Sequence, residues 1–325
     1  MYIRRKIIIQ PGGDYLEIER VDCGVIVSDD DVVRVKEMGN VVELMYQEKR
    51  NTKNYIKKIS DSKYIDLRTG EVKDCIRTEN RSQSVNEVRK SLGRLRDYIN
   101  TNVTDVSKCK WVTLTYKENM TDTKKLYEDF KNFNKRMRYH LKKQGYEYEY
   151  IVAMEPQGRG AWHAHMLMIF NSKAPYIDND NVMSKMWGNG FTTTKKLDKN
   201  IDNLGAYLTA YLGDMELFEG KDLFGSEYII NNNYTISEAQ VDEEGKKVSK
   251  AFIKGLRMAL YPPKFNLYRC SRGIKKPEIF YTTEEKAQKK ISAGTLTFER
   301  TIKLTDLDSN YTNHINYRYY NKSRK

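Results

Sequence analysis

Several features that define common protein classes are scarce or missing in this chain of 325 residues. The four cysteines, Cys23, Cys75, Cys109 and Cys270, are scattered and form no CxxC pair, which argues against a zinc finger or ribbon. No segment matches the GxxxxGK[ST] phosphate-binding loop of helicases and ATPases. No apolar run approaches the roughly 18 residues of a membrane-spanning helix, and the N-terminal apolar run is too short for a signal peptide. These absences predict a cytoplasmic protein with reduced cysteines and no membrane partner.

Basic residues are in clear excess over acidic ones. The chain contains 57 lysines and arginines and 44 aspartates and glutamates, which gives a net charge of +13. Such an excess favours a polyanionic partner, although many soluble proteins are basic without binding nucleic acid. The charge therefore makes nucleic acid a plausible partner and does not establish it.

The length and the local patterns predict three parts. Residues 1–80 contain short apolar segments between turn residues, so we expect a small, strand-rich accessory region whose role stays open. Residues 85–300 hold the longest regular patterns and are predicted to form the main domain. Residues 301–325 carry no acid from Tyr311 onward and are interpreted as a basic, tyrosine-rich tail.

The main domain shows the periodicities of alternating strands and helices. Trp111–Tyr116 has the residues of a strong strand, and Asp122–Lys143 has apolar residues three and four positions apart, as in an amphipathic helix. Further segments are predicted as a helix after Ser84, strands at Glu147–Glu155, after the turn Gln157–Gly160 and at Gly190–Lys195, and a helix at Asp202–Met215 with Asp202 as its N-cap. The order β-α-β-β-α-β-α predicts an α+β fold, with a mostly antiparallel sheet and helices packed on one face.

Two of the four histidines stand one residue apart among strand-forming residues. Side chains at i and i+2 of a strand point to the same face, so His163 and His165 are predicted to present two imidazoles side by side. Glu155 lies just across the glycine-rich turn, on the preceding strand. Two nitrogens and a carboxylate oxygen form a mixed site that suits Mg²⁺ or Mn²⁺. The alternative is a pair of half-buried histidines that only satisfy hydrogen bonds.

Two tyrosines lie four residues apart on the helix predicted at Asp202–Met215. Residues at i and i+4 share a helix face, so Tyr207 and Tyr211 are predicted to point the same way. A phenol oxygen can attack a phosphate when a metal ion offsets the developing charge, which makes either tyrosine a candidate nucleophile. The chain has 24 tyrosines, however, and an i,i+4 aromatic pair often belongs to a hydrophobic core.

Three of these segments together resemble a known family. They are the strand Trp111–Tyr116, the His163-Ala164-His165 triplet with its upstream acid Glu155, and the helix bearing Tyr207 and Tyr211. Their order and spacing resemble the HUH endonuclease superfamily, specifically the rolling-circle replication initiator (Rep) proteins of bacterial plasmids, phages and integrative elements. The resemblance covers roughly residues 85–280. It implies that the main domain is an HUH endonuclease domain with a ferredoxin/RRM-like antiparallel sheet.

The resemblance also implies a metal-dependent transesterification on single-stranded DNA. Glu155, His163 and His165 would hold Mg²⁺ or Mn²⁺, and Tyr207 or Tyr211 would attack a backbone phosphate. The products would be a 5′-phosphotyrosine and a free 3′-OH that primes rolling-circle replication. Tyr207 is favoured because it matches the first tyrosine of the family motif, and the choice between the two tyrosines stays open.

Basic residues near these motifs are candidates for contacts with the DNA backbone. They are Arg159 in the turn before the histidines, and Lys195 and Lys196 at the end of the last predicted strand. The implied partner is single-stranded DNA at a hairpin or nick site of a replication origin. Because no ATPase motif is present, a host helicase and a host polymerase would complete replication in the bacterial cytoplasm.

Two other interpretations fit part of the pattern. A relaxase or transposase of the same superfamily would share the chemistry, but relaxases usually carry a third histidine in the metal motif. His140 and His314 lie far from that motif in the sequence. A non-catalytic nucleic-acid-binding module with an RRM-like sheet would bind through aromatic residues on its strands. Such a module requires neither the histidine pair nor the paired tyrosines, so the initiator is the favoured interpretation.

Overall fold

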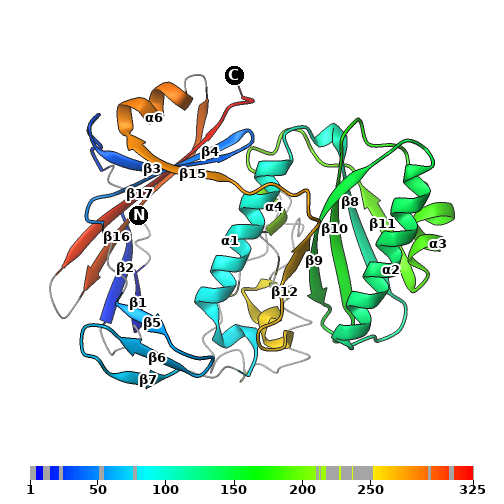
Figure 1. Cartoon of the computed structure of the whole chain (residues 1–325), viewed down its shortest axis with the longest axis horizontal. Helices are drawn as coiled ribbons and strands as arrows, with labels where there is room; N and C mark the ends of the chain where they lie inside the picture. Colours follow the sequence, from blue (N-terminus) through cyan, green and yellow to red (C-terminus); the bar gives the residue numbers. More distant parts are fainter. Residues whose placement is uncertain are drawn as a thin grey trace, which may run out of the picture. The chain divides into compact units, whose positions relative to one another are not determined.

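The computed structural model describes residues 5–9, 15–21, 25–50, 55–75, 79–209, 212, 214–216, 227, 236, 252–291, 294–306 and 311–324. The chain divides into two compact units. The first combines Met1–Arg77 with Lys276–Lys325, and the second is Thr78–Lys275. Each unit has its own sheets and its own hydrophobic core, and Figure 1 identifies their elements.

The second unit is built on an antiparallel sheet of five strands, in the order β11-β8-β10-β9-β14. The strands are β8 (Cys109–Tyr116), β9 (Tyr148–Pro156), β10 (Trp162–Phe170), β11 (Gly190–Lys195) and β14 (Tyr268–Cys270). Along the chain, β8 is followed by α2, β9, β10, α3 and β11 (Figure 1). The predicted β-α-β-β-α-β order is therefore confirmed.

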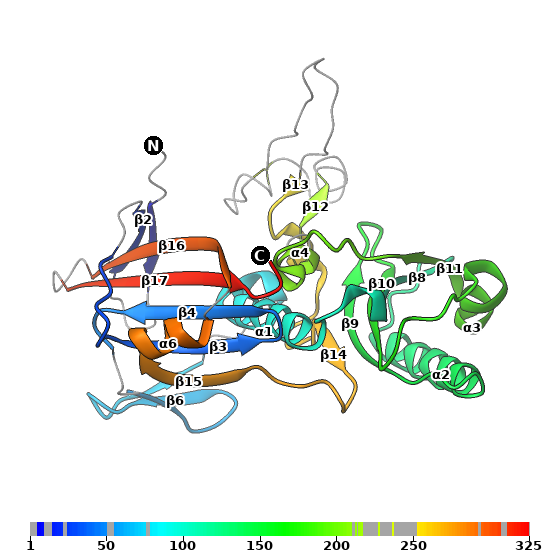
Figure 2. The same ribbon diagram turned by 90° about the horizontal axis from the view of Figure 1, so that it is seen from above.

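Helix α2 (Thr123–Lys142) covers one face of this sheet (Figure 2). It begins after Asp122, whose carboxylate accepts hydrogen bonds from the N–H groups of Lys124 and Lys125 at 2.7 and 3.3 Å, as an N-cap does. Its buried apolar residues are Leu126, Phe130, Phe133, Met137 and Leu141. They pack against alternate strand residues, which include Val112, Leu114, Met154, Ala164 and Met166. The short helix α3 (Ser184–Trp187), preceded by a π-helical turn (Asn179–Met183), packs beside α2.

Two further helices pack on the opposite face, so the expectation of helices on one face alone is wrong. The residues of this second core include Leu95 and Ile99 of α1 (Val85–Asn102), Leu204 of α4 (Leu204–Thr209), and Ile151, Ala153 and Leu167 of the strands. The strand residues that face α1 and α4 alternate with those that face α2. Strands that are apolar at consecutive positions, as β9 and β10 are, become buried on both faces.

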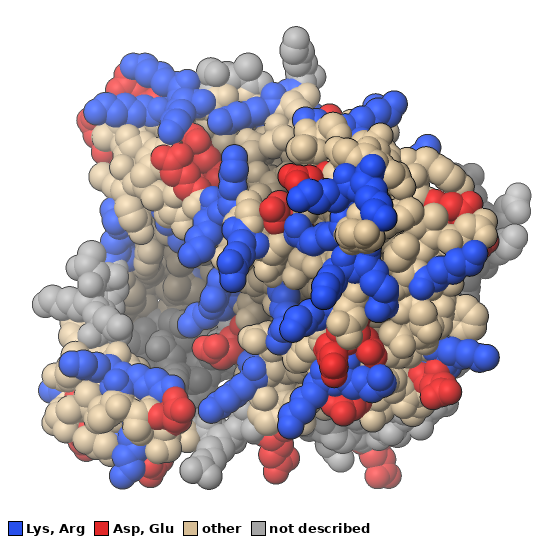
Figure 3. All heavy atoms as spheres, turned by 45° about the vertical axis from the view of Figure 1, so that its right-hand side comes forward, with Lys and Arg blue, Asp and Glu red and all other residues tan. Residues whose placement is uncertain are grey.

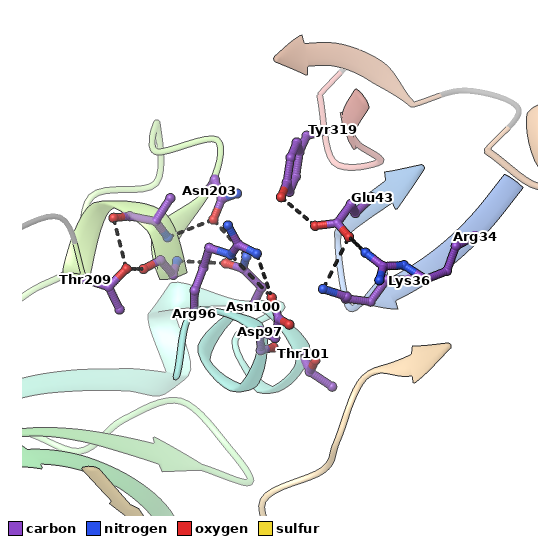
Figure 4. Close-up of polar contacts among 12 residues, drawn as sticks. Arg34, Lys36, Glu43, Arg96, Asp97, Asn100, Thr101, Asn203, Thr209 and Tyr319 are labelled. Carbon is purple, nitrogen blue, oxygen red and sulfur yellow. Dashed lines mark hydrogen bonds and ion pairs between the residues drawn. The ribbon is translucent and has the colours of Figure 1, made fainter. Parts of the chain in front are cut away.

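The start of α4 is fixed by two asparagines rather than by Asp202, the predicted N-cap. The Asn203 side chain accepts a hydrogen bond from the Ala206 N–H at 2.8 Å. Asn100 on α1 accepts from the Gly205 N–H at 2.7 Å and donates to the Asn203 side chain at 2.8 Å (Figure 4). These contacts attach the helix that carries Tyr207 to α1.

The described part of α4 ends at Thr209, whereas the sequence predicts a helix to Met215. Met215 instead belongs to β12 (Met215–Glu216), which pairs with β13 (Phe252–Ile253). Ala210, Tyr211 and Gly213 lie outside the described residues. Three 3-10 helices complete the described part of this unit: Arg81–Gln83, Val106–Lys108 and Leu256–Leu260.

The first unit contains an antiparallel sheet of seven strands, in the order β1-β2-β16-β17-β4-β3-β15. The strands are β1 (Arg5–Ile9), β2 (Tyr15–Val21), β3 (Val32–Met38), β4 (Val41–Gln47), β15 (Glu278–Thr283), β16 (Thr295–Asp306) and β17 (Thr312–Asn321). Helix α6 (Glu284–Ile291) packs its Ala287 and Ile291 against Val33 and Leu44. A smaller sheet contains β5 (Ile56–Lys58), β6 (Lys63–Asp66) and β7 (Val72–Asp74).

Both ends of the chain contribute to the first unit, which differs from the predicted division into residues 1–80, 85–300 and 301–325. β15 pairs with β3, β16 with β2, and β17 with β4. The segment predicted as a basic tail therefore forms a central strand, in which Asn316 and Tyr320 are buried. β17 pairs with the neighbouring β16 and with β4, which is remote in sequence, and composition alone does not reveal the second partner.

A buried carboxylate joins three strands of the first unit. Glu43 on β4 is 2% exposed and pairs with Arg34 at 2.7 Å and with Lys36 at 3.3 Å, both on β3. Glu43 also accepts a hydrogen bond from the Tyr319 hydroxyl on β17 (Figure 4). A carboxylate withdrawn from water requires such partners, because an unpaired buried charge is very costly.

The surface is strongly charged. Figure 3 shows one face, on which Lys and Arg side chains are spread widely and Asp and Glu side chains form smaller groups. This distribution agrees with the net charge of +13 and suits a polyanionic partner. Among the described residues, no helix combines the length and the apolar character that crossing a lipid bilayer requires.

The close contact between α4 and α1 can be tested at Gly205. A Cβ atom there would lie 2.3 Å from the Arg96 carbonyl oxygen and 2.8 Å from Asn100 Oδ1. We expect Gly205→Ala to lower the free energy of unfolding by about 1–3 kcal/mol, because overpacking forces the two helices apart. Urea denaturation measures this change.

Gly93→Ala on α1 is the matched control. A Cβ atom at Gly93 would meet nothing within 4 Å, so alanine should preserve the stability or raise it by up to about 1 kcal/mol. Equal stability of the Gly205→Ala and Gly93→Ala proteins would contradict the close approach of α4 to α1.

Candidate metal centre

Glu155, His163 and His165 lie together on the sheet face that also carries α1 and α4. Antiparallel pairing places His163 directly opposite Glu155, and His165 follows two residues later on the same face. Glu155 Oε2 lies 3.3 Å from Nε2 of His163 and 3.0 Å from Nε2 of His165. The three candidate ligand atoms all lie within 4.8 Å of one another, close enough to share one ion.

The other carboxylate oxygen of Glu155 is bound to Arg257, from a distant part of the chain. Arg257 Nε lies 2.8 Å from Glu155 Oε1, and only 12% and 8% of the two side chains are exposed. The same guanidinium donates to the carbonyl oxygen of Pro156 at 2.7 Å and to that of Asp214 at 2.9 Å. Oε1 therefore faces a fixed cation, whereas Oε2 faces both histidines.

His165 is supported by two residues of β8. Its ring stacks on Trp111, with ring centroids 5.6 Å apart and planes inclined by 12°. Its Nδ1 lies 3.2 Å from the Thr113 hydroxyl oxygen. In the tautomer with the proton on Nδ1, His165 donates to Thr113 and keeps the Nε2 lone pair for a metal ion. A hydrogen-bond partner behind a metal-binding histidine fixes both its tautomer and its orientation.

The protonation states of the cluster favour metal binding. Burial alone raises the pKa of Glu155, but hydrogen bonds with His163 and His165 and the charge of Arg257 outweigh it and hold that pKa well below its usual range. Burial lowers the pKa of His163, and the charges of His165 and Arg257 lower it further, against an opposing hydrogen bond with Glu155. At neutral pH, Glu155 is ionised and His163 is neutral, which are the forms that bind metal ions.

The donor set fits a divalent cation that keeps open coordination positions. Two imidazole nitrogens and one carboxylate oxygen are a common set of protein ligands, and catalytic sites with three such ligands leave further positions to water or substrate. The side chains of His163 and His165 are 16% and 19% exposed, more than the 8% of Glu155. The cluster is therefore accessible to solvent on the side of the histidines.

Helix α4, which carries one of the two candidate tyrosines, packs on the sheet face that carries the cluster. Leu204 and Leu208 of α4 share a core with Ala153, which lies on the same face of β9 as Glu155. Tyr207 is 54% exposed, so its phenol is accessible to a ligand rather than part of the core. Tyr211, the second candidate, lies outside the described residues.

The three basic residues predicted to contact DNA are all exposed. Arg159, in the β9–β10 turn, donates to the Tyr116 carbonyl oxygen at 2.8 Å and to Gln157 Oε1 at 3.0 Å. Part of its role is therefore to hold this turn against the end of β8. Lys195 ends β11, and Lys196 follows it. Contacts of these residues with DNA stay a prediction.

The other two histidines take no part in the cluster. His140 lies on α2, with Nε2 2.9 Å from the side-chain nitrogen of Gln144. His314 belongs to the first unit and pairs with Glu48 at 2.8 Å. Within the described residues, the candidate metal-ligand cluster therefore contains two histidines and one glutamate.

Arg257 and Asp214 complete the surroundings of the cluster, and neither role was predicted. The Asp214 carboxylate binds Lys254 Nζ and the Gly255 N–H, each at 2.8 Å, and so holds the turn that precedes Arg257. The one sequence signal is that Arg257 is a lone charge within the apolar segment Leu256–Leu260. A charge in an apolar segment indicates a buried partner without identifying it.

Residues 109–216, a third of the chain, match a family model of replication-associated proteins, the ORF2 family. This match supports a rolling-circle replication initiator. The matched stretch contains β8 to β11 and α4, and with them the three cluster residues and both candidate tyrosines. Searches of curated proteins and of solved structures found no match.

The support of His165 by Thr113 can be tested by metal binding. Thr113→Val keeps the shape of a β-branched side chain and removes the hydroxyl. We expect it to weaken Mn²⁺ binding by about 10- to 100-fold, the usual effect of removing a hydrogen-bond partner behind a metal-binding histidine. Isothermal titration calorimetry with Mn²⁺ measures the dissociation constant.

Thr193→Val is the control for this substitution, because Thr193 occupies the register position opposite Thr113 on β11. It should bind Mn²⁺ like the unmodified protein. If Thr113→Val also retains full affinity for Mn²⁺, the Thr113 hydroxyl does not orient His165.

Proposed function

We propose that the second unit nicks and rejoins single-stranded DNA at a replication origin and so initiates rolling-circle replication. The observation that carries this proposal is the cluster of Glu155, His163 and His165 on the sheet face against which the Tyr207 helix packs. A metal-ligand cluster and a nucleophile on one face are the parts that a tyrosine transesterification requires. The family match over residues 109–216 gives separate support for a role in replication.

The topology of the unit supports an HUH-type nuclease core. The elements follow one another as β8-α2-β9-β10-α3-β11, and the sheet order is β11-β8-β10-β9 before β14 is added. This is the β-α-β-β-α-β arrangement of ferredoxin-like folds. We therefore infer a ferredoxin/RRM-like sheet that carries the HUH site near the turn between its β9 and β10 strands.

Glu155, His163 and His165 would hold one divalent cation. When bound, such a cation withdraws electron density from a phosphate oxygen and makes the phosphorus a better electrophile. Mn²⁺ accepts imidazole as well as carboxylate ligands, whereas Mg²⁺ prefers oxygen. The two-nitrogen donor set therefore favours Mn²⁺, with Mg²⁺ as the alternative.

Tyr207 would supply the nucleophile, since its phenol is exposed on the helix that packs against this face. The phenol oxygen forms a bond to phosphorus while the bond from phosphorus to the 3′ oxygen of the preceding nucleotide breaks. The phenol proton passes to solvent, and the departing 3′ oxygen takes up a proton. The products are a 5′-phosphotyrosine and a free 3′-OH. The phosphotyrosine ester keeps the energy of the broken phosphodiester bond. Attack of Tyr211 on a later strand would form a second phosphotyrosine and release a new 3′-OH. Attack of that 3′-OH on the phosphorus of the first phosphotyrosine would release the Tyr207 phenol and complete the joining.

The DNA strand would be held by charge as well as by the metal centre. Arg159, Lys195 and Lys196 are exposed cations that can neutralise phosphates along the strand. A host helicase and a host polymerase would supply unwinding and synthesis, because the chain has no phosphate-binding loop of the ATPase type.

The identity of the nucleophile can be tested with tyrosine variants. The protein is mixed with Mn²⁺ and labelled single-stranded oligonucleotides that tile the DNA of the replicon encoding it, and covalent adducts are resolved on a denaturing gel. We expect Tyr207→Phe to lose the first-strand adduct completely, because phenylalanine has no oxygen to attack phosphorus. Tyr211→Phe should retain it.

Tyr176→Phe is the control, because Tyr176 is exposed in the same unit but lies outside α4. It should form the adduct at the normal rate. An adduct that persists in Tyr207→Phe and disappears in Tyr211→Phe would assign the nucleophile to Tyr211 instead.

Metal removal should separate DNA binding from chemistry. We expect EDTA to abolish the covalent adduct, because the cluster then lacks its cation, and to change oligonucleotide affinity by no more than about threefold, because phosphate contacts dominate affinity. Fluorescence anisotropy measures binding in the same samples.

His165→Ala with Mn²⁺ present should behave like the EDTA-treated protein. An adduct that survives EDTA would disprove metal dependence, and binding with no adduct in any metal would favour a non-catalytic module.

A further inference from the structure

A buried guanidinium shares the Glu155 carboxylate with the metal-ligand cluster. Arg257 Nε lies 2.8 Å from Oε1, whereas both imidazoles lie near Oε2. Because both side chains are almost fully buried, water screens their interaction only partly. The negative charge of Glu155 would therefore be divided between Arg257 and a cation bound by the cluster.

The backbone holds this guanidinium in place. Its hydrogen bond to the Pro156 carbonyl oxygen fixes it to the residue that follows Glu155 on β9. Its hydrogen bond to the Asp214 carbonyl oxygen fixes it to the segment that follows α4, the helix of Tyr207. Arg257 thus joins the strand of the metal ligand to the segment after the nucleophile.

We propose that Arg257 is a positioning residue that restricts Glu155 to one metal-binding oxygen and so keeps a coordination position open for the phosphate. This inference rests on the nicking function proposed above. With Oε1 held by the guanidinium, Glu155 reaches a cation only through Oε2. The protein then contributes three donor atoms, and the remaining positions stay available to phosphate oxygens and water.

Loss of the guanidinium should affect metal binding and nicking in opposite directions. Without Arg257, the buried carboxylate lacks its fixed counter-charge, and both of its oxygens are free to bind a cation. The repulsion between the guanidinium and the cation also disappears, so metal binding becomes tighter. Nicking becomes slower, because a bidentate Glu155 occupies the position that the phosphate needs. A purely structural role for Arg257 predicts instead that both properties decline together.

The experiment compares Arg257→Met with the unmodified full chain. Methionine has a similar length and no charge. We expect the dissociation constant for Mn²⁺, measured by calorimetry, to fall about tenfold. At saturating Mn²⁺, the rate of covalent adduct formation with the tiled oligonucleotides should fall by at least about tenfold.

A further substitution separates the effect of charge from that of geometry, and another serves as a control. Arg257→Lys keeps the positive charge without the planar fork of donors, so its Mn²⁺ affinity should stay within about threefold of the unmodified value while nicking declines. Arg136→Met is the matched control, because Arg136 also donates to two backbone carbonyl oxygens, those of Met186 and Trp187, outside the cluster. It should leave both measurements unchanged.

Weaker or unchanged Mn²⁺ binding in Arg257→Met would overturn the proposal, and so would tighter binding with a normal nicking rate. If Arg257→Met does not fold, Arg257→Gln carries the same expectations, because it is also neutral and keeps one hydrogen-bonding group. If the unmodified protein forms no adduct but Arg257→Met still binds Mn²⁺ more tightly, the control of Glu155 by Arg257 stands and the nicking function fails.

Discussion

The pairing of β9 with β10 is the contact on which the candidate site depends. It sets His163 opposite Glu155 and brings His165 to the same face, and the turn at Gly160, with a φ of 87°, closes the hairpin that fixes this register. A slip of one residue would turn both imidazoles toward α2, because side chains alternate along a strand. Residues of β8 then support the ring of His165, and Arg257 pairs with the carboxylate of Glu155.

Each unit has a buried carboxylate whose charge is compensated by its partners, but the two sets of partners differ in their ability to bind a metal ion. Glu43 is balanced by Arg34, Lys36 and a tyrosine hydroxyl, none of which is a usual ligand for a divalent cation. Glu155 is balanced by a guanidinium and two imidazoles. Neutral imidazoles can bind a metal ion through the same nitrogens that contact Glu155. One carboxylate therefore only joins strands, whereas the other can exchange hydrogen bonds for a metal ion.

The parts of the fold that could be predicted are those whose determinants are local. Strand and helix periodicities identified β8, α2 and β11, and the three cluster residues are joined by a single turn, so their proximity followed from strand geometry. The contact of Arg257 with Glu155 could not be predicted, because it depends on how distant segments pack. The predicted end of the α4 helix at Met215 was wrong for a similar reason. Met215 pairs with β13, and this tertiary contact overrides helix propensity. Burial of β9 on both faces likewise depends on α1 and α4.

The division of the first unit between the two ends of the chain has a consequence for folding. The contacts of Thr78–Lys275 lie within one continuous stretch, whereas β2, β3 and β4 pair with strands that are synthesised last. Contacts between remote segments form slowly, and domains fold as units in the order in which their sequence is completed during synthesis. We expect the second unit to be complete while the seven-stranded sheet is still open. A chain that stopped before β15 would therefore have a folded second unit but unpaired strand edges in the first unit, and such edges promote aggregation.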